Sequence, residues 1–283
     1  MNHHEGRRAF LALVVTSPFW CTMFYLGIRG VLTMEPKEDV PGSERSGMQE
    51  PPNVGEEAIP VPDLKMNIPD GYRGESIGPG VEMYKNGQEW VQVVDLEKAK
   101  LVVVDSEKGW KKPDWFWSKF KKKYKGRATS LFGAVHYAEG RLQFGLRDGE
   151  EIWNREIDSG LAGQRMLSIE GNYAKVGGYD KDKLDGDEGV VIGGEGIEKS
   201  NREWNKRRAR TILTADETGR KLLVMVFAGA TREDVIKVLK KWGIAEANAI
   251  NIQGGTFTEL RVRGNELLGY GEDVTLMLGI VER

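Results

Sequence analysis

Hydrophobic residues between positions 210 and 260 follow the order of a strand, a helix and a second strand. Residues 222–227 (LLVMVF) form a continuous apolar run of strand length, and ANAINI at 247–252 forms another. Between these runs, apolar residues recur on one helical face at Val235, Ile236, Leu239 and Trp242. This order predicts a right-handed βαβ unit, whose second strand leads into Gly254 and Gly255.

The ends of the predicted helix carry their own signals. Thr231 and Asp234 have the spacing of a capping box, in which each side chain accepts a hydrogen bond from the backbone N–H of the other residue. Gly243 directly follows the last apolar position of the helical face. The sequence therefore predicts a helix that begins after Thr231 and ends before Gly243.

Shorter apolar runs predict further strands. They cover residues 91–96, 101–104, 142–152, 167–176 and 190–192. We expect the first two to pair with each other, and those at 142–152 and 167–176 to form hairpins with glycine turns. We interpret residues 193–196 (GGEG) as a turn. The predicted fold class is α+β, with a mixed β-sheet and few helices, preceded by one transmembrane helix and an extended linker.

A long apolar run lies near the amino terminus, at residues 10–28. At about 1.5 Å per residue, a helix of this length spans roughly 28 Å, close to the hydrocarbon thickness of a bilayer. Pro18 would kink such a helix without excluding it. A cleavable signal peptide is the alternative, but IRGV at 28–31 is a poor cleavage site. We therefore expect an uncleaved membrane anchor over residues 10–32.

The residues around this anchor leave its orientation open. Arg7 and Arg8 precede the apolar run. Arg29 and Lys37 follow it, so positive charge is almost equal on the two sides. The only cysteine, Cys21, lies within the run. The remainder of the chain therefore has no thiol, which fits an exported domain without disulfides and equally a cytosolic one.

Composition divides the rest of the chain into a linker and a domain. Residues 33–80 are rich in Pro, Glu and Gly and cannot bury enough apolar surface to fold alone, so we expect an extended linker. Residues 81–283 are long enough to form one domain with a substantial core. The net charge of −2 argues against generic nucleic-acid binding. We expect no cofactor and no metal, since the acidic run at 180–188 lacks EF-hand spacing.

One stretch departs from this charge balance. Residues 108–125 contain eight lysines and six aromatic residues. As a structural element, the stretch is a short helix capped by Asp114, with Phe116, Phe120 and Tyr124 facing the core. As a functional element, tryptophans beside lysines suit the headgroup layer of an anionic membrane or the acidic face of a partner. The expected contact residues are Trp110, Trp115, Trp117, Lys121, Lys122 and Lys123.

Three segments of the chain resemble elements of one family. NAINIQGGTFTEL at 248–260 resembles the motif NLDGGGS of the phosphodiester glycosidase family. Arg210 and Thr211, with residues 215–219, resemble an upstream element of that family, and residues 130–152 resemble its asparagine- and glycine-rich element. The likeness extends over residues 91–281. It implies a phosphodiester glycosidase fold and a location outside the cytoplasm, where such domains act on glycans.

The sequence departs from the family motif where the chemistry is expected. Gln253 replaces the motif's aspartate, and Thr256 replaces its third glycine. A glutamine cannot ionise, so it cannot act as a general acid or base. Arg210 is kept and could hold a phosphate bidentately. The catalytic candidates are Arg210, Gln253, His136 and Glu259. The candidate ligand-binding residues are Arg210, Thr211, Gly254, Gly255 and Thr256.

These departures favour a domain without hydrolytic activity. We expect a single-pass, membrane-anchored periplasmic protein with residues 1–9 as a cytoplasmic tail, acting as an accessory subunit of a larger inner-membrane complex. A respiratory or photosynthetic complex is one such host. Its partners would be the bilayer through residues 10–32 and other subunits, with a glycan as a further ligand and no nucleic acid. The alternative is an active glycosidase that hydrolyses sugar phosphodiesters in envelope polysaccharide, with Arg210 binding the phosphate.

Overall fold

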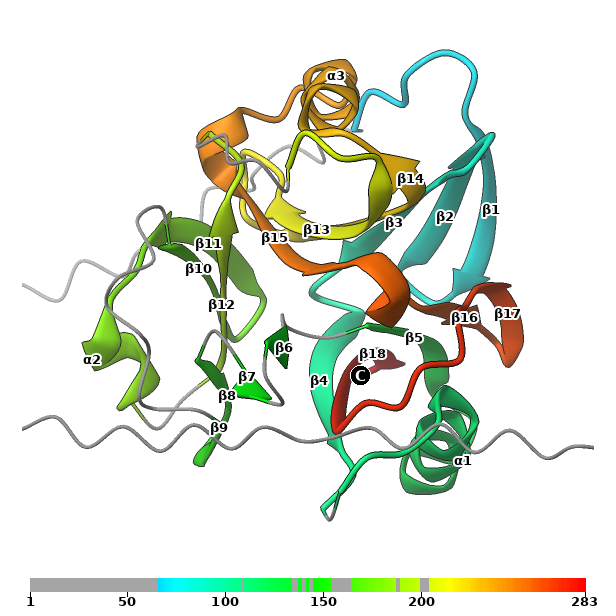
Figure 1. The fold of residues 1–283 in the computed structure, drawn as a ribbon, viewed down its shortest axis with the longest axis vertical. Coiled ribbons are helices and arrows are strands. Elements are labelled where there is room, and N and C mark those ends of the chain that lie inside the picture. Colours follow the sequence, from blue (N-terminus) through cyan, green and yellow to red (C-terminus); the bar gives the residue numbers. More distant parts are fainter. Residues whose placement is uncertain are drawn as a thin grey trace, which may run out of the picture. The chain divides into compact units, whose positions relative to one another are not determined.

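The computed structural model describes residues 66–283 except 108, 134–136, 139–140, 143–144, 154–163, 187–188 and 199–203. Within these residues the protein consists mainly of antiparallel strands, with few helices (Figure 1). The predicted anchor at 10–32 and most of the predicted linker lie outside the described residues. In the part of the chain that is described, no helix is long and apolar enough to cross a membrane.

The larger sheet follows the order β1-β2-β3-β14-β13-β15-β12-β10-β11, and β8 and β9 extend it from β12. Its amino-terminal strands are β1 (Arg73–Gly78), β2 (Val81–Asn86) and β3 (Glu89–Asp95). Its other half contains β8 (Leu146–Asp148), β9 (Glu151–Trp153), β10 (Gln164–Glu170), β11 (Tyr173–Gly178) and β12 (Val190–Gly196). The strands at its centre are β13 (Arg208–Ala215), β14 (Lys221–Ala230) and β15 (Ala249–Gly254).

The smaller sheet follows the order β17-β16-β5-β18-β4. Its strands are β4 (Ala99–Asp105), β5 (Ala128–Gly133), β16 (Leu260–Val262), β17 (Asn265–Leu268) and β18 (Leu276–Glu282). A separate pair consists of β6 (Tyr137–Ala138) and β7 (Arg141–Leu142). The helices are α1 (Pro113–Tyr124), α2 (Lys181–Leu184) and α3 (Arg232–Lys241), with 3₁₀ turns η1 (Glu246–Asn248) and η2 (Gly255–Phe257).

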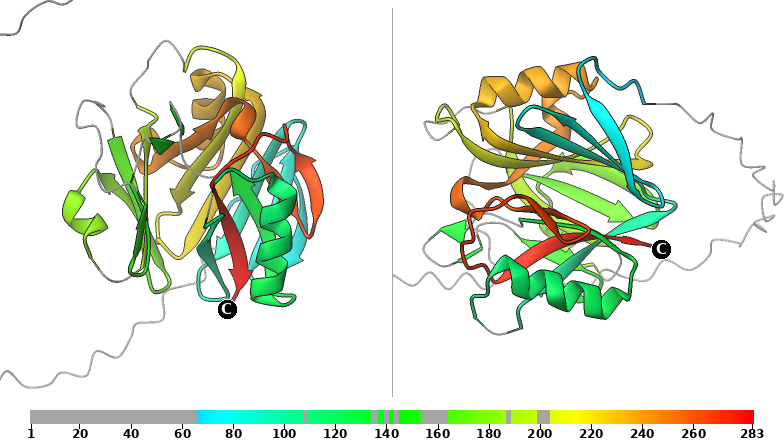
Figure 2. Two further views of the ribbon diagram at one scale, coloured as in Figure 1. Left: turned by 60° about the horizontal axis from the view of Figure 1, so that its bottom comes forward. Right: turned by 90° about the vertical axis from the view of Figure 1, so that its right-hand side faces the viewer.

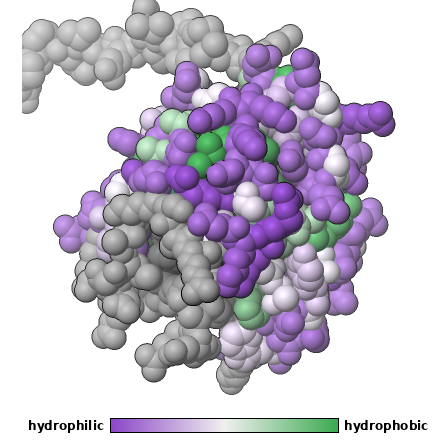
Figure 3. All heavy atoms as spheres, turned by 45° about the horizontal axis from the view of Figure 1, so that its top comes forward, coloured by the Kyte–Doolittle hydropathy of each residue, from purple (hydrophilic) through white to green (hydrophobic). Residues whose placement is uncertain are grey.

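The two sheets pack face to face between α3 and α1, which lie on opposite sides of the domain (Figures 1 and 2). Alternate residues of β14 show why: Leu222, Val224 and Val226 enter the core between the sheets. Their neighbours, including Leu223 and Met225, enter a second core beneath α3. A third core joins the smaller sheet to α1. The surface on the α3 side is mostly hydrophilic, with small separate apolar areas (Figure 3).

The predicted α+β class with a mixed sheet is wrong. The described residues form mainly strands, and every strand pairing among them is antiparallel. The strand, helix and strand predicted between 210 and 260 do form, as β14, α3 and β15. However, β13 lies between β14 and β15 and pairs antiparallel with both. A continuous apolar run indicates burial on both faces, and a strand between a second sheet and a helix meets that condition as well as a parallel strand does.

The helix signals are confirmed for α3. Thr231 is its N-cap, and its hydroxyl accepts from the backbone N–H of Asp234 at 3.3 Å, while the Asp234 carboxylate accepts from the backbone N–H of Thr231 at 3.0 Å. For α1 the predicted cap is wrong. Its N-cap is Lys112, without a side-chain capping bond, and Asp114 lies in the first turn. The Asp114 carboxylate instead accepts from Nη1 of Arg261 at 2.6 Å.

Two local predictions are wrong because the position of distant strands, which local sequence does not show, decides both. The runs at 91–96 and 101–104 lie in β3 and β4, which belong to different sheets and do not pair. Residues 193–196 continue β12 and do not form a turn. At Gly194 a Cβ atom would lie 2.9 Å from the backbone oxygen of Asn251 in β15, so the neighbouring strand leaves no room for a side chain. The hairpin predicted at 167–176 is confirmed as β10 and β11.

Residues 66–80, which composition assigns to the linker, pack on the domain. Met66, Ile68 and Tyr72 contact the core beneath α3, and β1 forms the edge of the larger sheet. The Tyr72 hydroxyl donates to Glu89 at 2.7 Å, and its ring contacts that of Trp242 edge-on at 5.2 Å. The folded unit therefore includes this segment.

Candidate functional site

The structure brings together the three segments that resemble family motifs. In the pairing of β13 with β15, Arg210 lies opposite Gly254 and Thr211 lies opposite Gln253. Gly133, at the end of β5, approaches the same segment: its N–H donates to the Glu259 carbonyl at 3.2 Å. The motif segments therefore meet at one place, where the chain leaves β15 in the larger sheet and continues to β16 in the smaller sheet.

Arg210 is the positively charged residue of this site, and contacts within the protein hold its guanidinium in place. Its side chain is buried, with 4% of the residue exposed. The guanidinium carbon lies 4.6 Å from the centre of the Trp204 ring, a cation–π distance, and Nη2 donates to the Lys206 carbonyl at 3.2 Å. A Cβ atom on Gly254 would lie 3.2 Å from Nη1, so this glycine leaves room for the guanidinium. Trp204 could not be predicted as part of the site, because no sequence motif links it to Arg210.

Gln253, Thr211 and the following glycines form the end of β15. Gln253 and Thr211 are both buried, at 1% and 0% exposure. Gly255 has φ of +71°, a left-handed conformation that favours glycine and that turns the chain into η2. Thr256 in this turn is exposed. The site therefore contains a buried neutral amide and a buried guanidinium on neighbouring strands, and Thr256 in the turn is exposed.

Glu259 is the only carboxylate in β5, β13 and residues 249–259. It is 1% exposed. Its Oε1 accepts from the backbone N–H groups of Tyr270 at 3.1 Å and Gly271 at 3.0 Å, and its Oε2 lies 3.9 Å from Nε of Arg261. Burial raises the pKa of Glu259, and the two backbone hydrogen bonds and the Arg261 charge offset that rise only in part. Glu259 thus anchors the segment that leads to β18.

The raised pKa of Glu259 predicts a pH-dependent stability. Above its ordinary pKa of 4.5, the unfolded chain releases a proton that the folded protein still holds. The Glu259 contribution to the free energy of unfolding is therefore fully present below pH 4.5 and decreases as the pH rises toward the folded-state pKa. Glu259→Gln removes this titration, so the stability of the unmodified protein should fall relative to the variant as the pH rises from 4.5. Urea unfolding at a series of pH values measures the difference. The exposed Glu217→Gln is the matched control, and parallel profiles for all three proteins would contradict the assignment.

The remaining predicted residues lie elsewhere or outside the described residues. His136 is among the latter. Trp110 and Trp115 are 43% and 37% exposed, and Lys121, Lys122 and Lys123 are exposed on α1. Trp117 is only 6% exposed and packs against Phe120, so its ring is not available at the surface. None of the tryptophans and lysines named here belongs to the site around Arg210.

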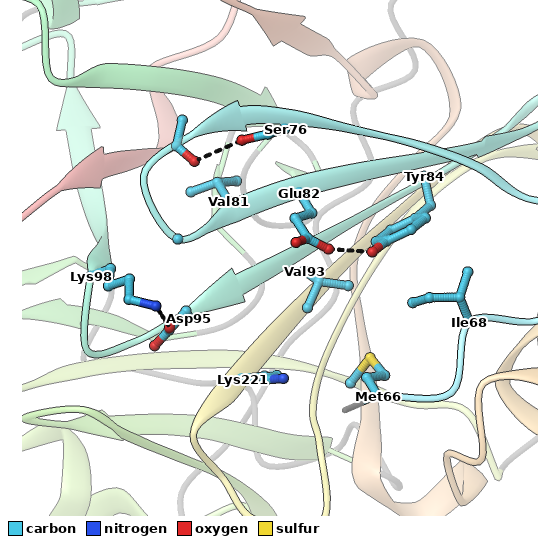
Figure 4. Close-up of a pocket in the computed structure, with 12 residues that line it drawn as sticks. Met66, Ile68, Ser76, Val81, Glu82, Tyr84, Val93, Asp95, Lys98 and Lys221 are labelled. Carbon is cyan, nitrogen blue, oxygen red and sulfur yellow. Dashed lines mark hydrogen bonds and ion pairs between the residues drawn. The ribbon is translucent and has the colours of Figure 1, made fainter. Parts of the chain in front are cut away.

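A separate groove of about 470 Å³ lies beside the β1–β2 turn (Figure 4). Its lining includes Met66, Ile68, Val81, Glu82, Tyr84, Val93, Asp95, Lys98 and Lys221. Four of the side chains that line it contact one another in pairs: the Tyr84 hydroxyl donates to Glu82, and Lys98 pairs with Asp95 at 3.0 Å. Burial, together with Glu82, raises the pKa of Tyr84 to about 12. The Tyr84 hydroxyl therefore remains protonated at neutral pH and offers no nucleophile.

Comparisons with known proteins identify the fold. No protein-family model and no curated protein matches the sequence. The catalytic domain of zebrafish N-acetylglucosamine-1-phosphodiester alpha-N-acetylglucosaminidase, auto-inhibited by its pro-peptide, is similar in structure, with a TM-score of 0.52 and 16% identity over 72% of this chain and 78% of that chain. The chain has a phosphodiester glycosidase fold. A hypothetical protein from Synechocystis has a TM-score of 0.42 and 10% identity, over 75% of this chain and 61% of that chain.

The phosphodiester glycosidase fold is therefore confirmed, and it explains why three separated motifs meet. The strands that carry them are β5, β13 and β15, from both sheets. The site of this domain differs from the family motif at a buried position, Gln253. The function of the domain therefore depends on the chemistry of the residues around Gln253.

Proposed function

We propose that this domain uses the phosphodiester glycosidase fold without hydrolysis, as a pseudoenzyme that serves as an accessory subunit of a larger assembly in the bacterial cell envelope. The observation that carries the proposal is the buried neutral amide of Gln253, 1% exposed, at the position of the motif's aspartate. Cleavage of a glycosidic bond ordinarily uses a carboxylic acid and a carboxylate on either side of that bond. Strands β5 and β13 and residues 249–259 contain one carboxylate, Glu259, and it is engaged in hydrogen bonds to the backbone.

Two ionisable candidates in the described part of the site, Glu259 and Arg210, support the same proposal. Glu259 accepts two backbone hydrogen bonds and is buried, so its carboxylate serves the fold. Arg210 stacks on Trp204 and donates to a carbonyl. An arginine is not a general acid or base at neutral pH, because its guanidinium does not release a proton. Glu259 holds the segment before β18, and Arg210 can hold structure or an anion, so neither is arranged as the acid or base of a hydrolysis.

Two measurements test the pseudoenzyme proposal. Hydrolysis of a sugar phosphodiester by the full-length protein should equal the buffer background and should be unchanged in Arg210→Ala. The native mass of the protein, extracted in mild detergent with its co-purifying proteins, should show one assembly of fixed stoichiometry. Hydrolysis above background that disappears in Arg210→Ala, together with recovery as a free monomer, would contradict the proposal.

The second candidate is an active phosphodiester glycosidase of envelope polysaccharide. The observation in its favour is the retained pair of Arg210 and Gly254, in which the glycine leaves space beside Nη1 for the guanidinium. Such a guanidinium binds a phosphodiester through charge-assisted hydrogen bonds. Gln253→Asp combined with Thr256→Gly restores the two motif residues. A rate increase in this variant over an inactive parent would mean that the parent lacks activity for want of these two motif residues, whereas an active parent would support the second candidate.

A further inference from the structure

Helix α1 has one face in the core and an opposite face in the solvent. The buried residues are Pro113, Phe116, Trp117 and Phe120. With 3.6 residues per turn, Trp115, Ser118 and Lys122 point away from that face, and Trp115 and Lys122 are nearly in line two turns apart. All three are exposed. In the ribbon views the helix lies on the outer side of the smaller sheet, opposite α3 (Figures 1 and 2).

The exposed face of α1 carries a concentrated positive charge. Between residues 108 and 127 there are nine Lys or Arg residues and one acidic residue, Asp114, although the whole chain has a net charge of −2. Two nearby acids are paired: Asp114 with Arg261 at 2.6 Å and Glu107 with Lys119 at 2.6 Å. Of the described lysines between residues 108 and 127, five have no ion-pair partner among the described residues, namely Lys111, Lys121, Lys122, Lys123 and Lys125.

Two tryptophans are exposed beside these lysines. Trp110 is 43% exposed just before α1, and Trp115 is 37% exposed in its first turn. They are two of four large hydrophobic residues exposed in the described structure. The Lys119 ammonium lies 5.3 Å from the centre of the Trp115 ring, so a cation and an indole are held at one spot. An indole with a cation beside it suits the boundary between water and lipid, where its ring is apolar and its N–H stays wet.

We propose that the exposed face of α1, together with Trp110, is a docking surface for an anionic lipid bilayer. Charge attraction alone would allow any anionic polymer to bind this surface. The exposed indoles favour a bilayer, because they gain from transfer into the headgroup layer and would gain little from a hydrated polymer. The lysines provide the electrostatic attraction and would face the negatively charged headgroups. Docking in this way turns α3 away from the membrane.

The first test compares two variants with the same change of net charge. Lys121→Gln, Lys122→Gln and Lys123→Gln together remove three charges from α1, and Lys237→Gln, Lys240→Gln and Lys241→Gln remove three exposed charges from α3. Binding of the full-length protein to vesicles of phosphatidylglycerol and phosphatidylcholine should weaken about 100-fold in the α1 variant. The α3 variant should bind as the unmodified protein does. Equal weakening in both variants would overturn the proposal.

The second test reads contact at α1 directly, whatever the rest of the chain contributes to vesicle binding. A nitroxide label is attached to Ser118→Cys on the exposed face, in a Cys21→Ser background that removes the only native cysteine. Lys237→Cys on α3 carries the control label. Anionic vesicles should shield the label at 118 from a water-soluble relaxation agent and leave the label at 237 accessible. A label at 118 that stays as accessible as the control would overturn the proposal.

A third comparison separates a bilayer from a soluble anionic polymer. Trp110→Ser with Trp115→Ser keeps every charge of the surface and should weaken binding to the vesicles while leaving binding of soluble polyphosphate unchanged. If the double variant binds vesicles as tightly as the unmodified protein, and polyphosphate shields the label at 118 as well as vesicles do, the ligand is an anionic polymer and the bilayer proposal fails.

Discussion

Phe120→Ala should lower the free energy of unfolding by about 3 to 5 kcal/mol, the usual cost of removing a buried aromatic ring. Phe120 is fully buried and lies between α1 and the smaller sheet. Its ring contacts those of Trp117 at 5.7 Å and Tyr124 at 5.2 Å. A Cβ atom on Gly279 in β18 would lie 2.7 Å from the ring, so the phenyl group rests directly on the strand backbone. Alanine would leave a cavity between helix and sheet that the rigid backbone cannot close.

Urea unfolding of the full-length protein measures this loss. Trp115→Ala is the matched control because it removes a larger ring from the same helix, at a position that is 37% exposed. We expect a clearly smaller loss for Trp115→Ala, since its indole already contacts water. Similar losses for the two variants would mean that α1 is not held on the sheet by Phe120.

Gly133→Ala should also destabilise the protein, by about 1 to 3 kcal/mol, because it overpacks the meeting point of the motif segments. A Cβ atom at position 133 would lie 2.6 Å from the Phe257 carbonyl oxygen and 3.3 Å from the Glu259 nitrogen. Both are backbone atoms, so no side-chain rotation can relieve the contact. The Gly133 N–H also donates to the Glu259 carbonyl at 3.2 Å, and moving the segments apart would strain this bond. The reduced freedom of an unfolded alanine returns only about 0.4 to 1 kcal/mol.

Gly178→Ala is the control for Gly133→Ala. Gly178 also lies in a strand, β11, but nothing is within 4 Å of the position where its Cβ would be built. This variant should be as stable as the unmodified protein or slightly more stable. A Gly133→Ala variant that behaves in the same way would show that the end of β5 and residues 257–259 can separate at little cost.

These two variants also bear on the functional proposals. Phe120 positions the helix whose outer face carries the proposed bilayer surface, so Phe120→Ala should weaken vesicle binding and stability together. Substitution of the exposed lysines should weaken binding alone. Gly133 holds the segment that follows Gln253 against β5. A site packed so closely is consistent with a domain whose motif residues now serve the fold.

The sequence by itself determined the local elements and the fold family. The apolar face of α3 and the capping box of Thr231 depend on residues a few positions apart, so a short stretch of chain contains the whole signal. The apolar run of β14 correctly indicated a strand with two buried faces. The resemblance of three separated motifs to phosphodiester glycosidases implied the fold that the comparison with solved structures confirms.

Only the tertiary structure decided which elements are neighbours. Burial on both faces of a strand does not tell a parallel sheet from an antiparallel one between a helix and a second sheet, so the insertion of β13 between β14 and β15 could not be predicted. At Gly133 and Gly194 there is no room for a side chain, because backbone atoms from distant parts of the chain lie against both glycines. Trp115 and Trp117 lie two positions apart in the same lysine-rich stretch, yet Trp117 packs in the core and Trp115 faces water. The stacking of Arg210 on Trp204 and the anchoring by Glu259 likewise arise from the folded arrangement of loops beside strands, because each joins groups whose spacing in the sequence carries no signal.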